Sequence, residues 1–208
     1  MTSRVTLIFK KGDPSVCDNY RPITLLSIGY KILASILLSR LQDAGAEERI
    51  WPTQFGFRSG VGTIDALFMT RRTLDLIWSR LNGCGIFLAL DWAKAFDSID
   101  PNCLADALRR FGVPGHFISL IQNIYACRKF FVRDMNVSST THSQHFGISQ
   151  GCPLSPFLFI IAMTIMMHDA HEKLTTEFGA FINDLPANDL LYADDTLLIG
   201  TNTETIQR

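Results

Sequence analysis

The chain has 208 residues, of which 47% are hydrophobic and 19% are charged, and its formal net charge is −1. A hydrophobic fraction of this size is typical of a globular protein with a real core, which argues against a disordered chain. A net charge near zero excludes the overall basic character that would by itself indicate nucleic-acid binding.

The basic residues and the cysteines give two further indications. Basic residues occur in four pairs, namely Lys10 and Lys11, Arg71 and Arg72, Arg109 and Arg110, and Arg128 and Lys129. Each pair alone is predicted to be solvated surface charge, although several together on one lobe could hold a phosphate backbone. The five cysteines are scattered, without a Cys-x-x-Cys pattern or a preceding secretory signal. This predicts reduced thiols in an intracellular protein.

The first half of the chain predicts two apolar strands and two helices. VTLIFKKGD forms a strand that ends at a Gly-Asp-Pro turn signal, and YRPITLLSIGYKILASILLSRLQ supplies a turn and an amphipathic helix at about 29–42. QFGFRSGVG (54–62) is a glycine-punctuated loop before a helix at about 63–81. A short apolar strand, Ile86–Leu90, then runs directly into Asp91.

The second half continues this mixture. Asp100 and Pro101 predict the cap and first turn of a helix that ends near Gly112, and a second helix is predicted over 115–126. Two strands are expected to flank the polar loop 138–144. GISQGCPLSP (147–156) opens a buried helix containing FLFIIAMTIMM, a run too short to cross a bilayer. Because strands and helices alternate irregularly, the predicted fold class is α+β.

Two adjacent carboxylates, Asp194 and Asp195, interrupt the last apolar run, LLYADDTLLIG. Burial of a charge costs free energy, so the pair is either a solvated turn or a site with a positive partner. Against the turn, Asp-Asp lacks the glycine that tight two-residue hairpins favour. Two adjacent antiparallel strands could bring Asp91 to the same place. Such a cluster repels itself unless cations neutralise it, and Mg²⁺ prefers carboxylate and phosphate oxygens. Two such ions could support nucleotidyl transfer.

Five ordered motifs carry a resemblance to a known family. FLALDWAKAFDSID, GISQGCPLSP and LLYADD resemble the three palm motifs of reverse transcriptases, while KKGDPSVCDNYRPITLLS and QFGFRSG resemble finger motifs of the non-LTR (LINE-type) retrotransposon branch. The resemblance covers almost the whole chain. It implies right-hand polymerase fingers at 1–86 and a palm at 87–208, with an antiparallel palm sheet backed by helices. Part of 112–148 is a candidate to pack with the fingers.

The resemblance also implies the metal site and the sugar gate. Asp91, Asp194 and Asp195 would be the catalytic carboxylates and would hold two Mg²⁺ ions, with Mn²⁺ as a substitute, together with the carbonyl of Trp92. Phe96 would be an aromatic gate that leaves no room for a 2′-OH, although an ordinary core position is the alternative.

Further substrate-binding roles follow from the same resemblance. Gln150 and Gly151 would pack against the nascent base pair and template, a role compatible with a helix-entry turn. Arg21, Lys31 and Arg58 would clamp the triphosphate, with a solvated or template-facing role as the alternative for the last two. Asp97 is expected to cap or form a salt bridge locally rather than to bind metal.

The implied function is the core of an RNA-directed DNA polymerase, from a retrotransposon polyprotein. Its expected partners are an RNA template, a DNA primer and dNTPs, not a membrane, and its expected location is the nucleus. The family pattern continues into a thumb, so the chain is expected to be a fragment or degenerate copy with low activity alone. The alternatives are a non-catalytic nucleic-acid-binding scaffold, which would have no need for three carboxylates, and an RNA-templated RNA polymerase or a DNA-templated enzyme with a similar palm.

Overall fold

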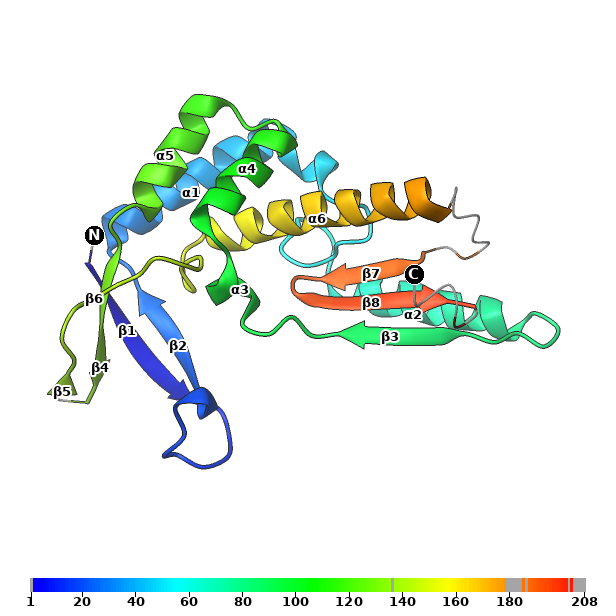
Figure 1. Cartoon of the computed structure of the whole chain (residues 1–208), viewed down its shortest axis with the longest axis horizontal. Coiled ribbons are helices and arrows are strands. Elements are labelled where there is room, and N and C mark those ends of the chain that lie inside the picture. Colours follow the sequence, from blue (N-terminus) through cyan, green and yellow to red (C-terminus); the bar gives the residue numbers. More distant parts are fainter. Residues whose placement is uncertain (1, 136, 179–184, 186, 202, 204–208) are drawn as a thin grey trace. The chain divides into compact units, whose positions relative to one another are not determined.

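The computed structural model describes residues 2–135, 137–178, 185, 187–201 and 203. The chain mixes helices with two β-sheets, which confirms the α+β prediction (Figure 1). It divides into two compact units: unit 1 consists of Met1–Ala44 and Lys94–Phe159, and unit 2 consists of Gly45–Ala93 and Ile160–Arg208. Each unit combines two separate stretches of sequence, so neither is a continuous segment such as 1–86. The assignment of fingers and palm stays a prediction.

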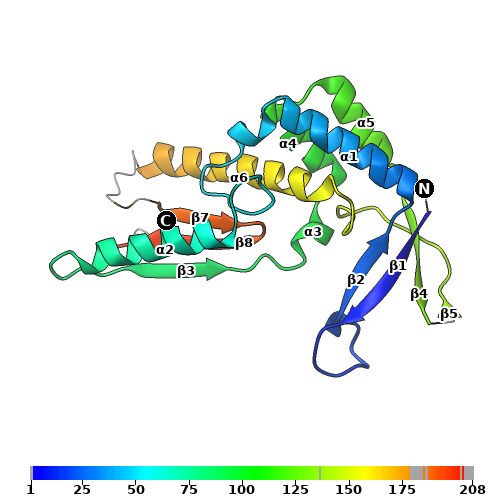
Figure 2. The ribbon, with the colours of Figure 1, turned by 180° about the vertical axis from the view of Figure 1, so that it is seen from behind.

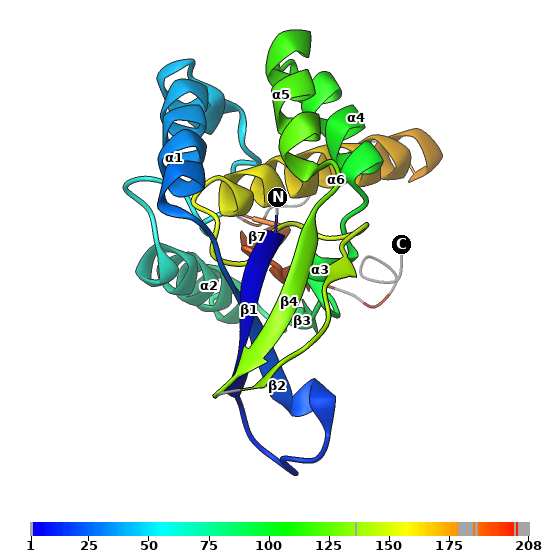
Figure 3. The same ribbon diagram turned by 90° about the vertical axis from the view of Figure 1, so that its left-hand side faces the viewer.

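Unit 1 contains a five-stranded sheet. Its strands are β1 (Thr2–Phe9), β2 (Tyr20–Leu25), β4 (Lys129–Asp134), β5 (Val137–Ser138) and β6 (His142–Ser143). Strand β1 lies between β2, to which it is antiparallel, and β4, to which it is parallel (Figure 1). Figure 3 shows β1 and β4 side by side and running in the same direction. Residues 138–144 were expected to form a polar loop, but this region contains the end of β5 and the whole of β6, because its backbone groups pair with β4. This part of the sequence prediction is therefore wrong.

The helices of unit 1 follow their sequence signals closely. They are α1 (Ile28–Asp43), α3 (Ala95–Ser98), α4 (Pro101–Phe111) and α5 (Gly115–Tyr125). Asp100 caps α4 by accepting a hydrogen bond from Asn102 N, and Gly112 ends it with a φ of 88°. Both roles confirm the prediction, because a carboxylate satisfies a free N–H at a helix start and glycine adopts a positive φ without strain.

Unit 2 is built around a three-stranded antiparallel sheet. Its strands are β3 (Ile86–Leu90), β7 (Asp189–Tyr192) and β8 (Asp195–Gly200), in the order β3-β8-β7. Helix α2 (Thr63–Trp78) lies along one face of this sheet, in front of it in Figure 2. Ile77 of α2 packs with Leu190 and Ile199 in one apolar cluster. An antiparallel sheet backed by a helix is what the resemblance implies.

The long helix α6 (Ser155–Phe178) begins in unit 1 and continues in unit 2. Residues 157–161, the start of the most lipophilic run, are at most 2% exposed, which confirms the prediction of a buried helix. Among the described residues, none of the helices combines the length and apolarity needed to span a membrane. All five cysteines carry free thiols, and only Cys152 is buried.

Candidate active site

The sheet of unit 2 brings two of the predicted carboxylates to one end of its strands β3 and β8. Leu90 of β3 pairs with Thr196 of β8, and Asp91 follows Leu90 directly, next to the position where Asp195 begins β8. Asp91 and Asp195 both line an open cavity of about 330 Å³, to which α2 and the strands contribute mainly apolar side chains. Adjacent antiparallel strands therefore place these two of the three expected carboxylates on one cavity.

Asp194 lies in the turn between β7 and β8. Tyr192 pairs with Asp195, so the connection consists of Ala193 and Asp194 alone. The tight hairpin thus forms without glycine. Its two turn residues are Ala193 and Asp194, so the turn lies one residue before the Asp194-Asp195 pair that was considered as a turn. Ala193 has a φ of 58°. A left-handed conformation costs an L-residue about 1–2 kcal/mol, so other contacts must hold this turn.

Those contacts come from Gln54, the first residue of the QFGFRSG motif, to which the sequence assigned no role of its own. Its side chain is fully buried, and Oε1 accepts hydrogen bonds from the backbone N–H groups of Ala193 (2.8 Å) and Gly56 (2.9 Å). Its Nε2 donates to the carbonyl of Ala193 at 3.2 Å. One amide therefore satisfies both backbone groups of the residue before Asp194.

Two further predicted residues of unit 2 contact the same elements. The indole Nε1 of Trp92 donates to the Thr196 hydroxyl of β8 at 3.2 Å, which fixes the chain just after Asp91. Arg58 Nη1 donates to the carbonyl of Gln54 at 3.1 Å. The buried Nε of Arg58 has no hydrogen-bond partner among the residues that the structure describes.

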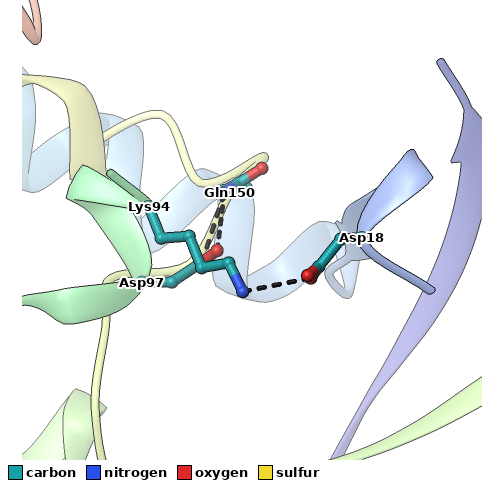
Figure 4. Close-up of polar contacts among 4 residues, drawn as sticks. All are labelled: Asp18, Lys94, Asp97 and Gln150. Carbon is teal, nitrogen blue, oxygen red and sulfur yellow. Dashed lines mark hydrogen bonds and ion pairs between the residues drawn. The ribbon is translucent and has the colours of Figure 1, made fainter. Parts of the chain in front are cut away.

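Unit 1 gathers another group of predicted residues around α3. Figure 4 shows Gln150 Nε2 donating to both carboxylate oxygens of Asp97, each at 3.3 Å. The carbonyl of Phe96 accepts a hydrogen bond from Ile148 N, and the Phe96 ring stacks on Phe159 with centroids 4.5 Å apart. Asp97 therefore bonds a glutamine amide 53 residues away, which is neither the local cap nor the salt bridge that was expected for it. The stacking suits either role of Phe96.

Beside Asp97, Figure 4 also shows Lys94, whose ammonium lies 3.1 Å from the Asp18 carboxylate. Both side chains are largely exposed, so this ion pair contributes little to stability. It ties the start of α3 to the loop between β1 and β2, within unit 1.

The segment after Gln150 is joined to β2. Thr24 N donates to the carbonyl of Gln150 at 3.1 Å. Gly151 has a φ of 104°, and a Cβ there would lie 2.7 Å from the Thr24 carbonyl oxygen, so glycine is required on both counts. Arg21, on the same strand as Thr24, and Lys31, in the first turn of α1, are both exposed.

Arg128 corrects the sequence interpretation of the basic pairs. It was expected to be solvated, but it is only 7% exposed. Its guanidinium donates to the carbonyls of Tyr125, Phe146 and Gly147 and to the Ser149 hydroxyl, and it lies 4.5 Å from the centroid of the Tyr125 ring. Burial lowers the pKa of this guanidinium. Arg128 thus holds the loop that leads to Gln150.

Comparison with known proteins decides the family. The family described as "Reverse transcriptase (RNA-dependent DNA polymerase)" matches residues 8–208. The chain belongs to the reverse transcriptase family.

The relatives of this reverse transcriptase domain place it in the non-LTR branch. It is 32% identical over 208 residues to the uncharacterized 149 kDa protein of transposon TX1 from Xenopus laevis, covering 98% of this chain and 15% of that protein. It is 30% identical over 190 residues to the Pol polyprotein of the type-2 retrotransposable element R2DM from Drosophila melanogaster, covering 91% of this chain and 17% of that protein. The chain thus spans less than a fifth of either relative.

A solved structure supports the fold. A telomerase from Candida tropicalis superimposes with a TM-score of 0.64 at 12% identity, covering 99% of this chain and 37% of that one. At this identity the likeness shows the fold alone. It agrees with the polymerase fold that the motifs imply.

Reverse transcriptases generally use divalent metal ions. The donors present fit such an ion, because Asp91 and Asp195 line one cavity and Mg²⁺ is usually held by one or two carboxylates plus substrate phosphates. Among the described residues, however, no three His, Cys, Asp or Glu side chains form a group that could hold a metal. The structure therefore does not show a preformed three-carboxylate site. The metal role of Asp91, Trp92, Asp194 and Asp195 stays a prediction.

Proposed function

We propose that this reverse transcriptase domain is the core of an RNA-directed DNA polymerase that adds deoxynucleotides to the 3′-OH of a primer. The observation that carries the proposal is the placement of Asp91 and Asp195 on one cavity, with Asp194 in the adjoining turn. A chain that only bound nucleic acid would have no use for acidic groups gathered at one end of two neighbouring strands, since they repel phosphate.

The chain's own residues would divide the work. Asp91, Asp194 and Asp195, with the carbonyl of Trp92, would hold two Mg²⁺ or Mn²⁺ ions. Such ions activate an attacking hydroxyl and stabilise the charge on a leaving pyrophosphate. The hydrogen bond between Trp92 and Thr196 would keep the backbone after β3 in position for this task.

The resemblance also implies the residues of substrate recognition. Phe96 would exclude the 2′-OH of ribonucleotides, and Gln150 with Gly151 would contact the nascent base pair. The bonds of the Gln150 side chain to Asp97 and of its carbonyl to Thr24 support this role, because a contact residue works best when its own position is fixed.

Three basic side chains and an RNA strand are the remaining parts of the proposed reaction. As the resemblance implies, Arg21, Lys31 and Arg58 would bind the triphosphate. RNA is the proposed template; the telomerase with this fold was solved in complex with a fragment of telomeric RNA. Copying of a retrotransposon RNA into chromosomal DNA would place the protein in the nucleus.

A non-catalytic nucleic-acid-binding scaffold is the second candidate. It is favoured by one observation, that the described residues contain no preformed group of three metal-binding side chains. Calorimetric titration with Mg²⁺ separates the two candidates. Saturable binding that Asp91→Asn abolishes supports the polymerase, and the absence of binding supports the scaffold.

Primer extension on poly(rA)/oligo(dT) with dTTP and Mg²⁺ tests the activity directly. It should be run with the chain alone and with the chain joined to the segment that follows the matched region in R2DM. Asp91→Asn and Asp194→Asn should each lower the rate about 100-fold or more, since the lost charge stabilisation acts on the transition state. Asp106→Asn, on the exposed surface of α4, is the matched control and should retain the parent rate. Unchanged extension by Asp194→Asn would refute the site.

A further inference from the structure

The turn that carries Asp194 is held from inside the protein by a glutamine 139 residues away in sequence. Gln54 is fully buried, and its amide bonds both the N–H and the carbonyl of Ala193. The same Oε1 bonds Gly56 N, so the amide links two backbone segments at once. A buried amide with these bonds satisfied has one orientation, which makes it a specific contact rather than a filler of space.

Backbone contacts dock the loop of Gln54 on β7. Phe55 N donates to the carbonyl of Leu191 at 2.8 Å, and Leu191 N donates to the carbonyl of Thr53 at 2.9 Å. Residues 53–55 thus run beside β7 as a short parallel bridge, which ends where Ala193 begins the turn.

Gly56 makes the close approach possible. A Cβ at this position would lie 2.3 Å from Ala193 N, a distance that no real contact shows. Gln54 and Gly56 together therefore form a clamp on Ala193. Gln54 bonds its backbone, and Gly56 allows the close approach because it has no side chain.

The clamp offsets a conformation that the local sequence does not favour. Two-residue hairpin turns with positive φ normally contain glycine, asparagine or aspartate in the first position, whereas this turn has Ala193 with a φ of 58°. Alanine offers no polar side chain to support the turn by itself. If the clamp were removed, the turn would relax, and the directions of the two following carboxylates, Asp194 and Asp195, would change with it.

We propose that Gln54 is a positioning residue for the polymerase reaction, acting through the backbone of Ala193 on the carboxylates of Asp194 and Asp195. This inference rests on the proposed function. A glutamate could not replace Gln54, because it lacks the N–H that bonds the Ala193 carbonyl and would place a buried negative charge next to the turn that carries Asp194.

The first test measures the turn itself and does not depend on activity. In Gln54→Leu, which keeps the volume and removes all three bonds, the amide of Ala193 should exchange with solvent at least about tenfold faster, while that of Leu88 in β3 should be unchanged. Gln122→Leu, at an exposed position on α5, is the matched control. Parent-like protection of Ala193 in Gln54→Leu would overturn the clamp.

The second test measures catalysis by primer extension. Gln54→Leu should lower kcat about 10- to 100-fold and raise the Mg²⁺ concentration needed for half-maximal rate, with the KM for dTTP within about twofold of the parent. A merely structural role would instead reduce the amount of active enzyme without changing the Mg²⁺ dependence. Gly56→Ala, which disturbs the clamp from its other side, should give the same pattern if Gln54→Leu does not fold.

A rescue experiment makes the inference specific. Glycine adopts a positive φ without cost, so Ala193→Gly in the Gln54→Leu background should restore most of the lost kcat. The absence of any rescue in a folded double variant would contradict the proposed route through Ala193. If the parent extends no primer at all, the proposed function fails, whereas the exchange measurement still decides whether Gln54 holds the turn.

Discussion

Replacement of Arg128 gives the sharpest stability prediction. Arg128→Met keeps most of the apolar stem and removes the guanidinium. The guanidinium donates four hydrogen bonds, and the shortest is the bond to the carbonyl of Gly147 at 2.7 Å. The other three are 3.3–3.4 Å long and are weaker. Gly147 is itself buried, so its carbonyl would lose its donor without gaining water.

The magnitude follows from these contacts. A hydrogen bond from a charged donor contributes about 1.5–3 kcal/mol, and a cation over an aromatic ring about 0.5–2 kcal/mol. Burial of the guanidinium, which lowers its pKa, offsets part of this sum. Arg128→Met should therefore lower the free energy of unfolding by roughly 2–3 kcal/mol, and Arg128→Lys by about half as much, because an ammonium can reach fewer of the acceptors.

Urea unfolding followed by circular dichroism measures this difference. Lys129→Met is the matched control, because the neighbouring lysine side chain is exposed, and it should change stability by less than about 0.5 kcal/mol. If Arg128→Met is as harmless as Lys129→Met, the guanidinium does not hold the loop before Gln150, and our account of that loop is wrong. A folded Arg128→Met should also show a raised KM for dTTP in primer extension.

Three other predictions follow from the same structure. Gly151→Ala combines a positive φ with a Cβ 2.7 Å from the Thr24 carbonyl, so it should destabilise by about 2 kcal/mol or more in urea unfolding; a loss below 0.5 kcal/mol would contradict the close approach. Phe96→Val should admit ribonucleotides in primer extension if the ring is a sugar gate, and unchanged sugar selectivity would leave Phe96 as a core residue stacked on Phe159. Burial raises the pKa of Tyr125 above its ordinary value of 10.0, so the unfolded chain releases the proton first and stability is lost as the pH rises above 10. Between pH 9 and 11 this single tyrosine should cost on the order of 1 kcal/mol, and Tyr125→Phe should lose correspondingly less over the same range.

The sequence by itself determined the main helices, the strand before Asp91 and the family. The strand Ile86–Leu90 has the predicted bounds, and α4 has its predicted cap, first-turn proline and terminal glycine. These signals act within one helical turn or one strand, so they can be read without knowledge of the fold. The ordered motifs likewise identified the reverse transcriptase family, because residue order is a property of the sequence alone.

Only the tertiary structure decided how the site is held. Nothing in the local sequence distinguishes Arg128, which is buried, from Lys129, which is exposed. Nor does the local sequence show that Ala193, which is not a glycine, adopts a positive φ. Gln54 and Ala193 meet only because the loop of residues 53–56 docks on β7. Contacts between residues so far apart depend on which backbone groups packing brings together, and burial then determines how strongly each unsatisfied group must be paired.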